Sequence, residues 1–156
     1  MYFKSRVDFI DEDSDFVFVF GGTNDYGHGD ADFGEKMDKT DNSFCGALNL
    51  LADNLLSKFG KDKLCFILPC RRYGGETKNS HGKTLKDYVD AIRDMSIRKE
   101  IDYIDLYNNF FPQPVTNKGD KYTIDGLHPN DYGYECLAKI IENYLKTKKI
   151  KRFNQL

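Results

Sequence analysis

Two side chains with clear catalytic potential, Asp125 and His128, stand three positions apart in this sequence. They belong to the stretch DGLHPNDYGY (125–134), in which a proline and the start of a helical pattern follow the histidine. A carboxylate that holds an imidazole in one tautomer leaves the other ring nitrogen ready to take a proton from a nucleophile. The same spacing also occurs in ordinary surface hydrogen bonds, so the pair by itself does not define a function.

A second stretch, GGTNDYGHGD (21–30), follows an apolar segment and contains a side-chain amide, Asn24, that can donate a hydrogen bond to a developing oxyanion. Gly22 and Gly27 have the glycine spacing of a phosphate-binding P-loop, but His and Gly stand where that motif needs Lys and Ser or Thr. A P-loop is therefore excluded. The alternative interpretation is an ordinary tight turn that uses glycine and asparagine at positive φ.

Three segments predict the strands that position these side chains: residues 15–20 (DFVFVF), 63–69 (KLCFILP) and 101–107 (IDYIDLY). They are rich in β-branched and aromatic residues, and the first is a continuous run of the kind found in strands covered on both faces of a parallel sheet. Apolar residues at helical spacing follow each strand, and a polar residue suited to capping precedes each helix. The predicted caps are Asn42 or Ser43, Thr84, and Asn130 or Asp131.

Strands that alternate with helices predict an α/β fold with a parallel sheet between helical layers, in one domain over residues 1–156. In such sheets ligands bind beside the carboxyl ends of the strands. Three loops therefore hold the candidate chemistry, at residues 21–41, 70–83 and 108–128.

The composition excludes several other classes of protein. A net charge of −2 without basic and aromatic residues interleaved argues against nucleic-acid binding, and the basic stretch 146–153 is interpreted as a solvated helix end. No apolar run approaches the ~20 residues that span a bilayer, and no signal peptide is recognisable, so we expect a cytoplasmic protein. The four cysteines lack zinc-ligand spacing and are expected to be reduced core thiols, and we predict no metal or cofactor.

The stretch GTND after an apolar strand, followed about a hundred residues later by DGLHP, resembles the SGNH, or GDSL-type, hydrolases. The resemblance covers the chain from Arg6 onward and implies a three-layer α/β/α fold of flavodoxin-like order. It implies that Asn24 donates to the oxyanion, that His128 is the general base oriented by Asp125, and that Gly22 lets the turn approach the site. Members hydrolyse esters without a metal, through an acyl-enzyme on a serine, and their substrates include lipids, acetylated sugars and short acyl esters.

The sequence departs from this family at the nucleophile. The family serine stands in a Gly-Asp-Ser stretch after the first strand, and this sequence has no such stretch. None of its serines is expected to end a strand beside Asn24; they are Ser5, Ser14, Ser43, Ser57, Ser80 and Ser96. Cys70 follows the second predicted strand and is an alternative nucleophile, although core packing is the favoured interpretation.

We therefore interpret the chain as the C-terminal part of an SGNH-type ester hydrolase that lacks the nucleophile and the first strands. The favoured explanation for their absence is a start codon that was placed too late. The chain alone is then expected to be inactive. The alternative is a non-catalytic binding or interaction module derived from that fold. Without the first strands, residues 15–20 form an exposed sheet edge, which predicts a homodimer that pairs this strand.

Five side chains in the first two loops are candidates for a substrate pocket. For loop 70–83 the alternative interpretation is a flexible surface loop. His28 lies near two aspartates in the sequence and could be a metal ligand, but a position in a polar pocket wall is the favoured interpretation. The candidates are Tyr26, His28, Arg71, Arg72 and Tyr73.

Overall fold

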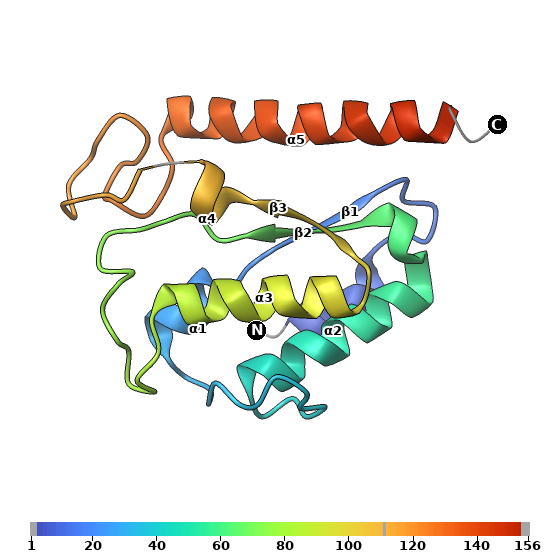
Figure 1. Ribbon diagram of the computed structural model, residues 1–156, viewed down its shortest axis with the longest axis horizontal. Coiled ribbons are helices and arrows are strands. Elements are labelled where there is room, and N and C mark those ends of the chain that lie inside the picture. Colours follow the sequence, from blue (N-terminus) through green and yellow to red (C-terminus); the bar gives the residue numbers. More distant parts are fainter. Residues whose placement is uncertain (1–2, 111, 154–156) are drawn as a thin grey trace. The chain divides into compact units, whose positions relative to one another are not determined.

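The computed structural model describes residues 3–110 and 112–153. The chain divides into two compact units, residues 1–111 and residues 112–156. In Figure 1 the first unit runs from blue to yellow and the second from orange to red. The expectation of a single domain remains a prediction.

The first unit is built on a parallel sheet of three strands in the order β1-β2-β3. The strands are β1 (Val17–Phe20), β2 (Leu64–Leu68) and β3 (Asp102–Asp105). Val17 pairs with Leu64, and Cys65 pairs with Asp102. All three predicted strands are confirmed, and so is the parallel α/β fold class.

The third strand is shorter than predicted, because its last residues form the short helix α4 (Leu106–Asn109). The Asp105 side chain accepts the Asn108 backbone N–H at 3.0 Å, which makes Asp105 the N-cap of that helix. A side chain that offers the backbone this alternative hydrogen bond favours a helix start over another residue of strand.

Two longer helices cover one face of the sheet (Figure 1). Helix α2 (Phe44–Phe59) begins after Ser43, whose hydroxyl accepts the Gly46 N–H at 3.2 Å, and helix α3 (Leu85–Arg98) begins after Thr84. Ser43 is the cap among the two predicted alternatives, and the predicted cap at Thr84 is confirmed. The apolar faces of both helices join β2, which is buried at all five positions, in one hydrophobic core.

A third helix, α1 (Thr23–His28), lies inside the segment predicted as a loop from residue 21 to 41. Among the described non-glycine residues only Glu100 has a positive φ, so the alternative of a tight turn with Asn24 at positive φ is wrong. The glycine part of that interpretation holds, because Gly22 has a φ of 102° and is the N-cap of α1.

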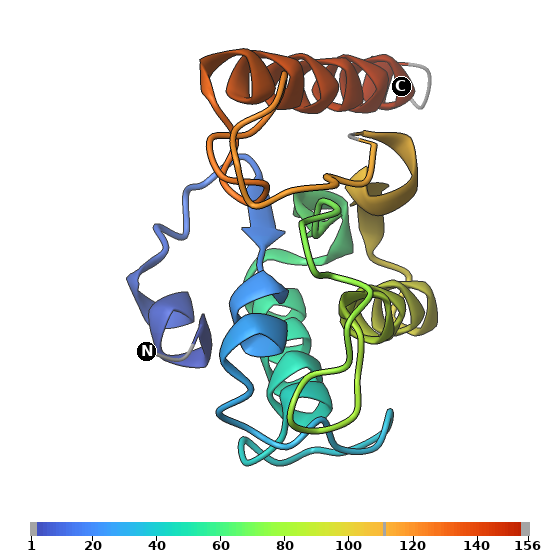
Figure 2. The ribbon, with the colours of Figure 1, turned by 90° about the vertical axis from the view of Figure 1, so that its left-hand side faces the viewer.

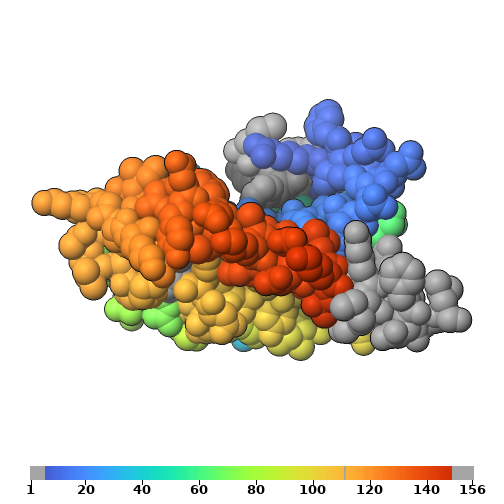
Figure 3. All heavy atoms as spheres, turned by 90° about the horizontal axis from the view of Figure 1, so that it is seen from above, coloured from blue at the N-terminus to red at the C-terminus, as the bar shows by residue number. Residues whose placement is uncertain are grey.

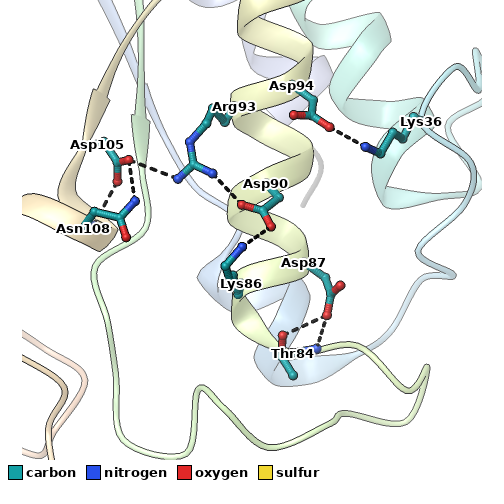
Figure 4. A network of polar contacts seen from close by, with 9 residues as sticks. All are labelled: Lys36, Thr84, Lys86, Asp87, Asp90, Arg93, Asp94, Asp105 and Asn108. Carbon is teal, nitrogen blue, oxygen red and sulfur yellow. Dashed lines mark hydrogen bonds and ion pairs between the residues drawn. The ribbon is translucent and has the colours of Figure 1, made fainter.

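An ion-pair network fixes α3 to the carboxyl end of β3 (Figure 4). The Arg93 guanidinium lies 2.5 Å from an Asp90 oxygen and 3.1 Å from an Asp105 oxygen. The same Asp105 carboxylate also accepts the Asn108 side-chain amide at 2.8 Å. One half-buried arginine therefore joins a helix, a strand and the turn that follows the strand.

The N-terminal segment forms the 3-10 helix η1 (Phe3–Phe9), which packs beside α2. The Lys58 ammonium group donates to the carbonyls of Val7 at 3.2 Å and Ile10 at 2.7 Å. Between α2 and β2 the chain forms the short 3-10 helix η2 (Lys61–Lys63).

The second unit consists of an irregular segment, residues 112–130, and helix α5 (Asp131–Phe153). Figure 3 shows the irregular segment gathered at the start of the helix. The Asn130 side-chain oxygen accepts the Gly133 N–H at 2.9 Å, so Asn130 is the cap among the two predicted alternatives. In the part of the chain that the structure describes, no helix combines the length and apolar character needed to cross a lipid bilayer.

Candidate functional site

Asp125 and His128 form a hydrogen-bonded pair in the second unit. Oδ2 of Asp125 lies 2.8 Å from Nδ1 of the His128 ring, while Oδ1 accepts the backbone N–H groups of Leu127 at 3.0 Å and of His128 at 2.8 Å. Because a carboxylate only accepts hydrogen bonds, Nδ1 carries the proton of the neutral imidazole and Nε2 keeps its lone pair. This is the tautomer in which a histidine acts as a general base.

The hydrogen bonds also keep Asp125 ionised. The backbone N–H of His128 is the largest cause and the His128 side chain the next, and with a smaller contribution from the Leu127 N–H the pKa of Asp125 falls from 3.8 to about 2. A carboxylate that stays charged at all ordinary pH values holds the ring orientation without competing for its proton.

A turn held by side-chain hydrogen bonds carries this pair. Oδ1 of Asp120 accepts the backbone N–H groups of Tyr122 and Thr123, both at 2.7 Å. The buried Thr123 hydroxyl accepts the N–H of Gly126 at 3.0 Å, and Gly126 has a φ of 76° that favours glycine. The dyad thus stands on a turn whose shape is fixed by several independent contacts.

Sequence reasoning missed Asp120 and Thr123 as residues that support the pair. A local signal was present. In Asx and Ser/Thr turns, the side chain of an Asp or a Thr accepts the backbone N–H of a residue two or three positions later. Asn130 adds to this support, because its side-chain amide donates to the carbonyls of Asp120 and Lys121, both at 3.2 Å.

Asn24 belongs to the first unit and is the second residue of α1, directly after the carboxyl end of β1. Its side chain is exposed, and it has no hydrogen-bond partner among the described residues of that unit. Gly22 is the N-cap of the helix with a φ of 102°, which favours glycine, and a Cβ there would lie 2.9 Å from the Ile92 side chain. The amide therefore lies on the short helix that follows the carboxyl end of β1, with its N–H groups free to donate.

The candidate pocket residues differ in how much of each side chain is free to contact a substrate. Tyr26 is buried, and its hydroxyl lies 2.6 Å from the Gly74 carbonyl, so it holds α1 in place. The Arg71 guanidinium stacks on the Tyr107 ring at 4.8 Å, and its Nε donates to the Tyr107 carbonyl at 2.8 Å. Both side chains therefore have structural contacts of their own.

Of the remaining candidates, Arg72 is half-buried. The guanidinium of Arg72 lies 5.7 Å from the centre of the Tyr26 ring, whereas Tyr73 and His28 are exposed. Among the described residues, no three His, Cys, Asp or Glu side chains are grouped as metal ligands.

Cys70 and the two buried serines have surroundings that do not activate a nucleophile. Burial raises the pKa of the Cys70 thiol to about 12, so the thiolate is nearly absent at neutral pH. Ser43 and Ser96 are buried and hydrogen-bonded within helices α2 and α3, through Gly46 and Ile92. None of the chain's serines directly follows a described strand.

Known proteins resemble this chain in sequence and in fold. Residues 3–136 match the GDSL-like Lipase/Acylhydrolase family. A protein of Lactobacillus plantarum has a crystal structure that matches with a TM-score of 0.80 and 30% sequence identity, covering 92% of this chain and 72% of that one. No curated protein matches the chain.

Two further solved structures share the fold. A possible lipase from Chitinophaga pinensis matches with a TM-score of 0.67 and 20% identity over 94% of this chain and 79% of its own. A lipase/acylhydrolase from Enterococcus faecalis matches with a TM-score of 0.61 and 22% identity over 88% of this chain and 64% of its own. The family match spans most of the sequence, and the chain belongs to the GDSL-like lipase/acylhydrolase family.

Proposed function

We propose that this chain supplies the general base and one oxyanion donor of an ester hydrolase. The observation that carries the proposal is the 2.8 Å contact between Asp125 and Nδ1 of His128, which leaves Nε2 to accept a proton. His128 then deprotonates a serine hydroxyl as that hydroxyl attacks the ester carbonyl. It later returns the proton to the leaving alcohol, and water hydrolyses the acyl-enzyme by the same route.

Asn24 donates its side-chain N–H to the oxyanion of the tetrahedral intermediate in this proposal. Support comes from its exposed, unengaged amide at the end of β1 and from the family to which the chain belongs. Gly22 contributes by allowing the tight entry into α1. Among the pocket candidates, the exposed His28 and Tyr73 and the half-buried Arg72 are proposed to contact the substrate.

In this proposal the nucleophile is the serine of a Gly-Asp-Ser segment that is not part of residues 1–156. Lipids, acetylated sugars and short acyl esters are the proposed substrate class. The proposal also includes pairing of β1 between two copies of the chain. The four cysteines form no disulfide in the described structure, which suits a reducing compartment such as the cytoplasm.

Hydrolysis of short p-nitrophenyl esters tests the proposal. We expect residues 1–156 alone to give only background rates, and a version extended by the upstream Gly-Asp-Ser segment to show turnover. In the extended protein, His128→Ala should nearly abolish kcat, and Asn24→Ala should lower it by ~10² to 10³. Asn143→Ala, at an exposed position of α5, is the matched control and should leave kcat unchanged.

Two outcomes would contradict the proposal. Turnover by residues 1–156 that survives His128→Ala would place the reaction at another nucleophile. Upstream DNA that lacks an in-frame Gly-Asp-Ser would instead leave the chain without the serine that the mechanism requires.

A further inference from the structure

Helix α1, which carries Asn24, is too short to be stable by itself. It has six residues, and isolated helices below ~12 residues are marginal in water. Two backbone hydrogen bonds join it to the glycines that flank it, Tyr26 N–H to the Gly22 carbonyl and Gly29 N–H to the Asp25 carbonyl, both at 3.1 Å. The carbonyls at its C-terminal end need donors from elsewhere in the chain.

Two side chains of loop 70–83 supply those donors. The Asn79 amide donates to the Tyr26 carbonyl at 3.2 Å. Nε2 of His81 lies 2.8 Å from the carbonyl of Gly29, the C-cap residue of α1, and must donate because a carbonyl only accepts. Figure 2 shows this loop beside α1 at the end of the first unit where β1 finishes. The loop therefore caps the helix from the side.

Helix α1 in turn donates a hydrogen bond to loop 70–83 through the Tyr26 side chain. The hydroxyl of the buried Tyr26 lies 2.6 Å from the Gly74 carbonyl and 2.9 Å from the Thr77 carbonyl. The Tyr26 ring also packs edge-on against Tyr88 of α3, with ring centres 5.9 Å apart. Helix α1 is thus joined to the loop through a backbone carbonyl and a side chain of the same residue, Tyr26.

Asn79 has all of its hydrogen-bonding groups engaged at this point. Besides the Tyr26 carbonyl, its amide donates to the Tyr88 hydroxyl at 3.0 Å. Its side-chain oxygen accepts the backbone N–H groups of His81 at 3.0 Å and Lys83 at 3.1 Å. One side chain therefore sets the shape of the loop and binds that loop to both α1 and α3. These contacts favour an ordered loop at residues 70–83 over the alternative of a flexible surface loop.

We propose that Asn79 is a positioning residue for the oxyanion donor, acting through α1. Asn79 and His81 hold the carbonyls at the C-terminal end of α1, Gly22 fixes its N-terminus, and the backbone that carries the Asn24 amide is thereby kept at one place after the carboxyl end of β1. The role given to Asn24 rests on the proposed function. Attachment of α1 to the loop does not, since it follows from contacts within the first unit.

Amide hydrogen exchange on residues 1–156 tests the proposal without any need for turnover. Asn79→Asp keeps the side-chain oxygen that accepts from the loop but replaces both donated N–H groups with a carboxylate oxygen facing the Tyr26 carbonyl. We expect the Tyr26 and Gly29 amides to exchange on the order of tenfold faster, while amides of β2 stay within about twofold. Asn143→Asp makes the same change at an exposed position of α5 and should alter neither.

A second readout follows Asn24 directly. The 15N relaxation of its side-chain amide should report greater motion in Asn79→Asp and in His81→Ala, and little change in Asn143→Asp. His81→Gln retains a side-chain N–H and should recover part of the order lost in His81→Ala. His81→Ala and His81→Gln still test the proposal if Asn79→Asp folds poorly.

Equal acceleration of exchange in α1 and β2 would show that Asn79 affects global stability alone, and would overturn the positioning role. Unchanged relaxation of the Asn24 side chain in both Asn79→Asp and His81→Ala would overturn it as well. If α1 responds as expected but Asn24→Ala leaves ester hydrolysis by the extended protein intact, the proposed function fails while the attachment of α1 stands.

Discussion

Among the individual residues, Asp125 has the most clearly defined electrostatic environment. Its carboxylate accepts two backbone N–H groups and faces the His128 ring, and all of these contacts favour the ionised form. The carboxyl group is therefore a fixed negative charge next to the proposed base.

The first prediction concerns the titration of this carboxyl group. In the folded protein the 13C NMR signal of the Asp125 carboxyl should titrate with a midpoint of about 2 instead of 3.8. Because the folded pKa is lowered, the contribution of the turn to stability is fully present above the unfolded value and is lost as the pH falls through about 2.

His128→Ala separates the two main causes of that shift. The substitution removes the imidazole but keeps the larger contribution, from the backbone N–H of residue 128, so the pKa should rise only part of the way to 3.8. A midpoint near 3.8 in the unsubstituted protein would show that the hydrogen-bonded pair does not form in solution.

The second prediction concerns Cys70. Burial raises the pKa of its thiol from 9.0 to about 12, a difference of about three pH units. Its thiolate fraction at pH 7.5 should be ~10³-fold lower than that of an ordinary exposed cysteine. Iodoacetamide should therefore alkylate Cys70 far more slowly in the native chain than in 6 M guanidinium, as peptide mass spectrometry can measure. Rapid native alkylation would make Cys70 a nucleophile to reconsider.

At the level of elements, the joint between α3 and β3 depends on Arg93. Burial would raise the pKa of Asp105, but hydrogen bonds from Asn108 and the charge of Arg93 outweigh it and lower that pKa below its usual range. The stabilisation is therefore present above the unfolded pKa of an aspartate and is lost as the pH falls through the lowered value.

The third prediction follows from this joint. Arg93→Met should reduce the free energy of unfolding at pH 7 by about 1–3 kcal/mol, because two carboxylates lose a charged partner. Lys86→Met removes only an exposed ion pair with Asp90 and should stay within about 0.5 kcal/mol. Urea unfolding at pH 7 and at pH 3 measures both variants, and the effect of Arg93→Met should shrink at the lower pH. Equal effects of the two substitutions would show that the joint is no stronger than a surface ion pair.

At the level of the whole molecule, β1 lies at the edge of the described sheet. The N-terminal segment forms η1 against α2 and does not extend the sheet in the described residues. An apolar edge strand favours pairing with another chain. Phe20 at the end of this strand is 46% exposed, which makes it a suitable position for a test.

The fourth prediction is self-association through this edge. Light scattering after size exclusion should give about twice the 18.0 kDa mass of the chain, and Phe20→Lys should shift the protein toward the monomer. Phe9→Lys, at an exposed phenylalanine of η1, is the matched control and should leave the mass unchanged. A monomer at micromolar concentration, or equal effects of both substitutions, would contradict pairing through β1.

The sequence by itself was sufficient for the elements whose signals are local. The run at residues 64–68, the cap at Thr84 and the apolar spacing of α2 and α3 each depend on neighbours within a few residues. The Asp125 and His128 pair is local as well, since three residues separate its members. Strand alternation with helices was then enough to predict a parallel sheet.

Only the tertiary structure decided the features that depend on residues distant in the chain. Helix α1 has too few residues to reveal itself by periodicity, and it is stabilised by Asn79 and His81, some fifty positions away. Tyr26 stood out in the sequence as a pocket candidate, yet its hydroxyl binds loop carbonyls that no local pattern indicates. Short elements at strand ends depend on such contacts, because their own hydrogen bonds are too few to offset the conformational entropy lost on folding.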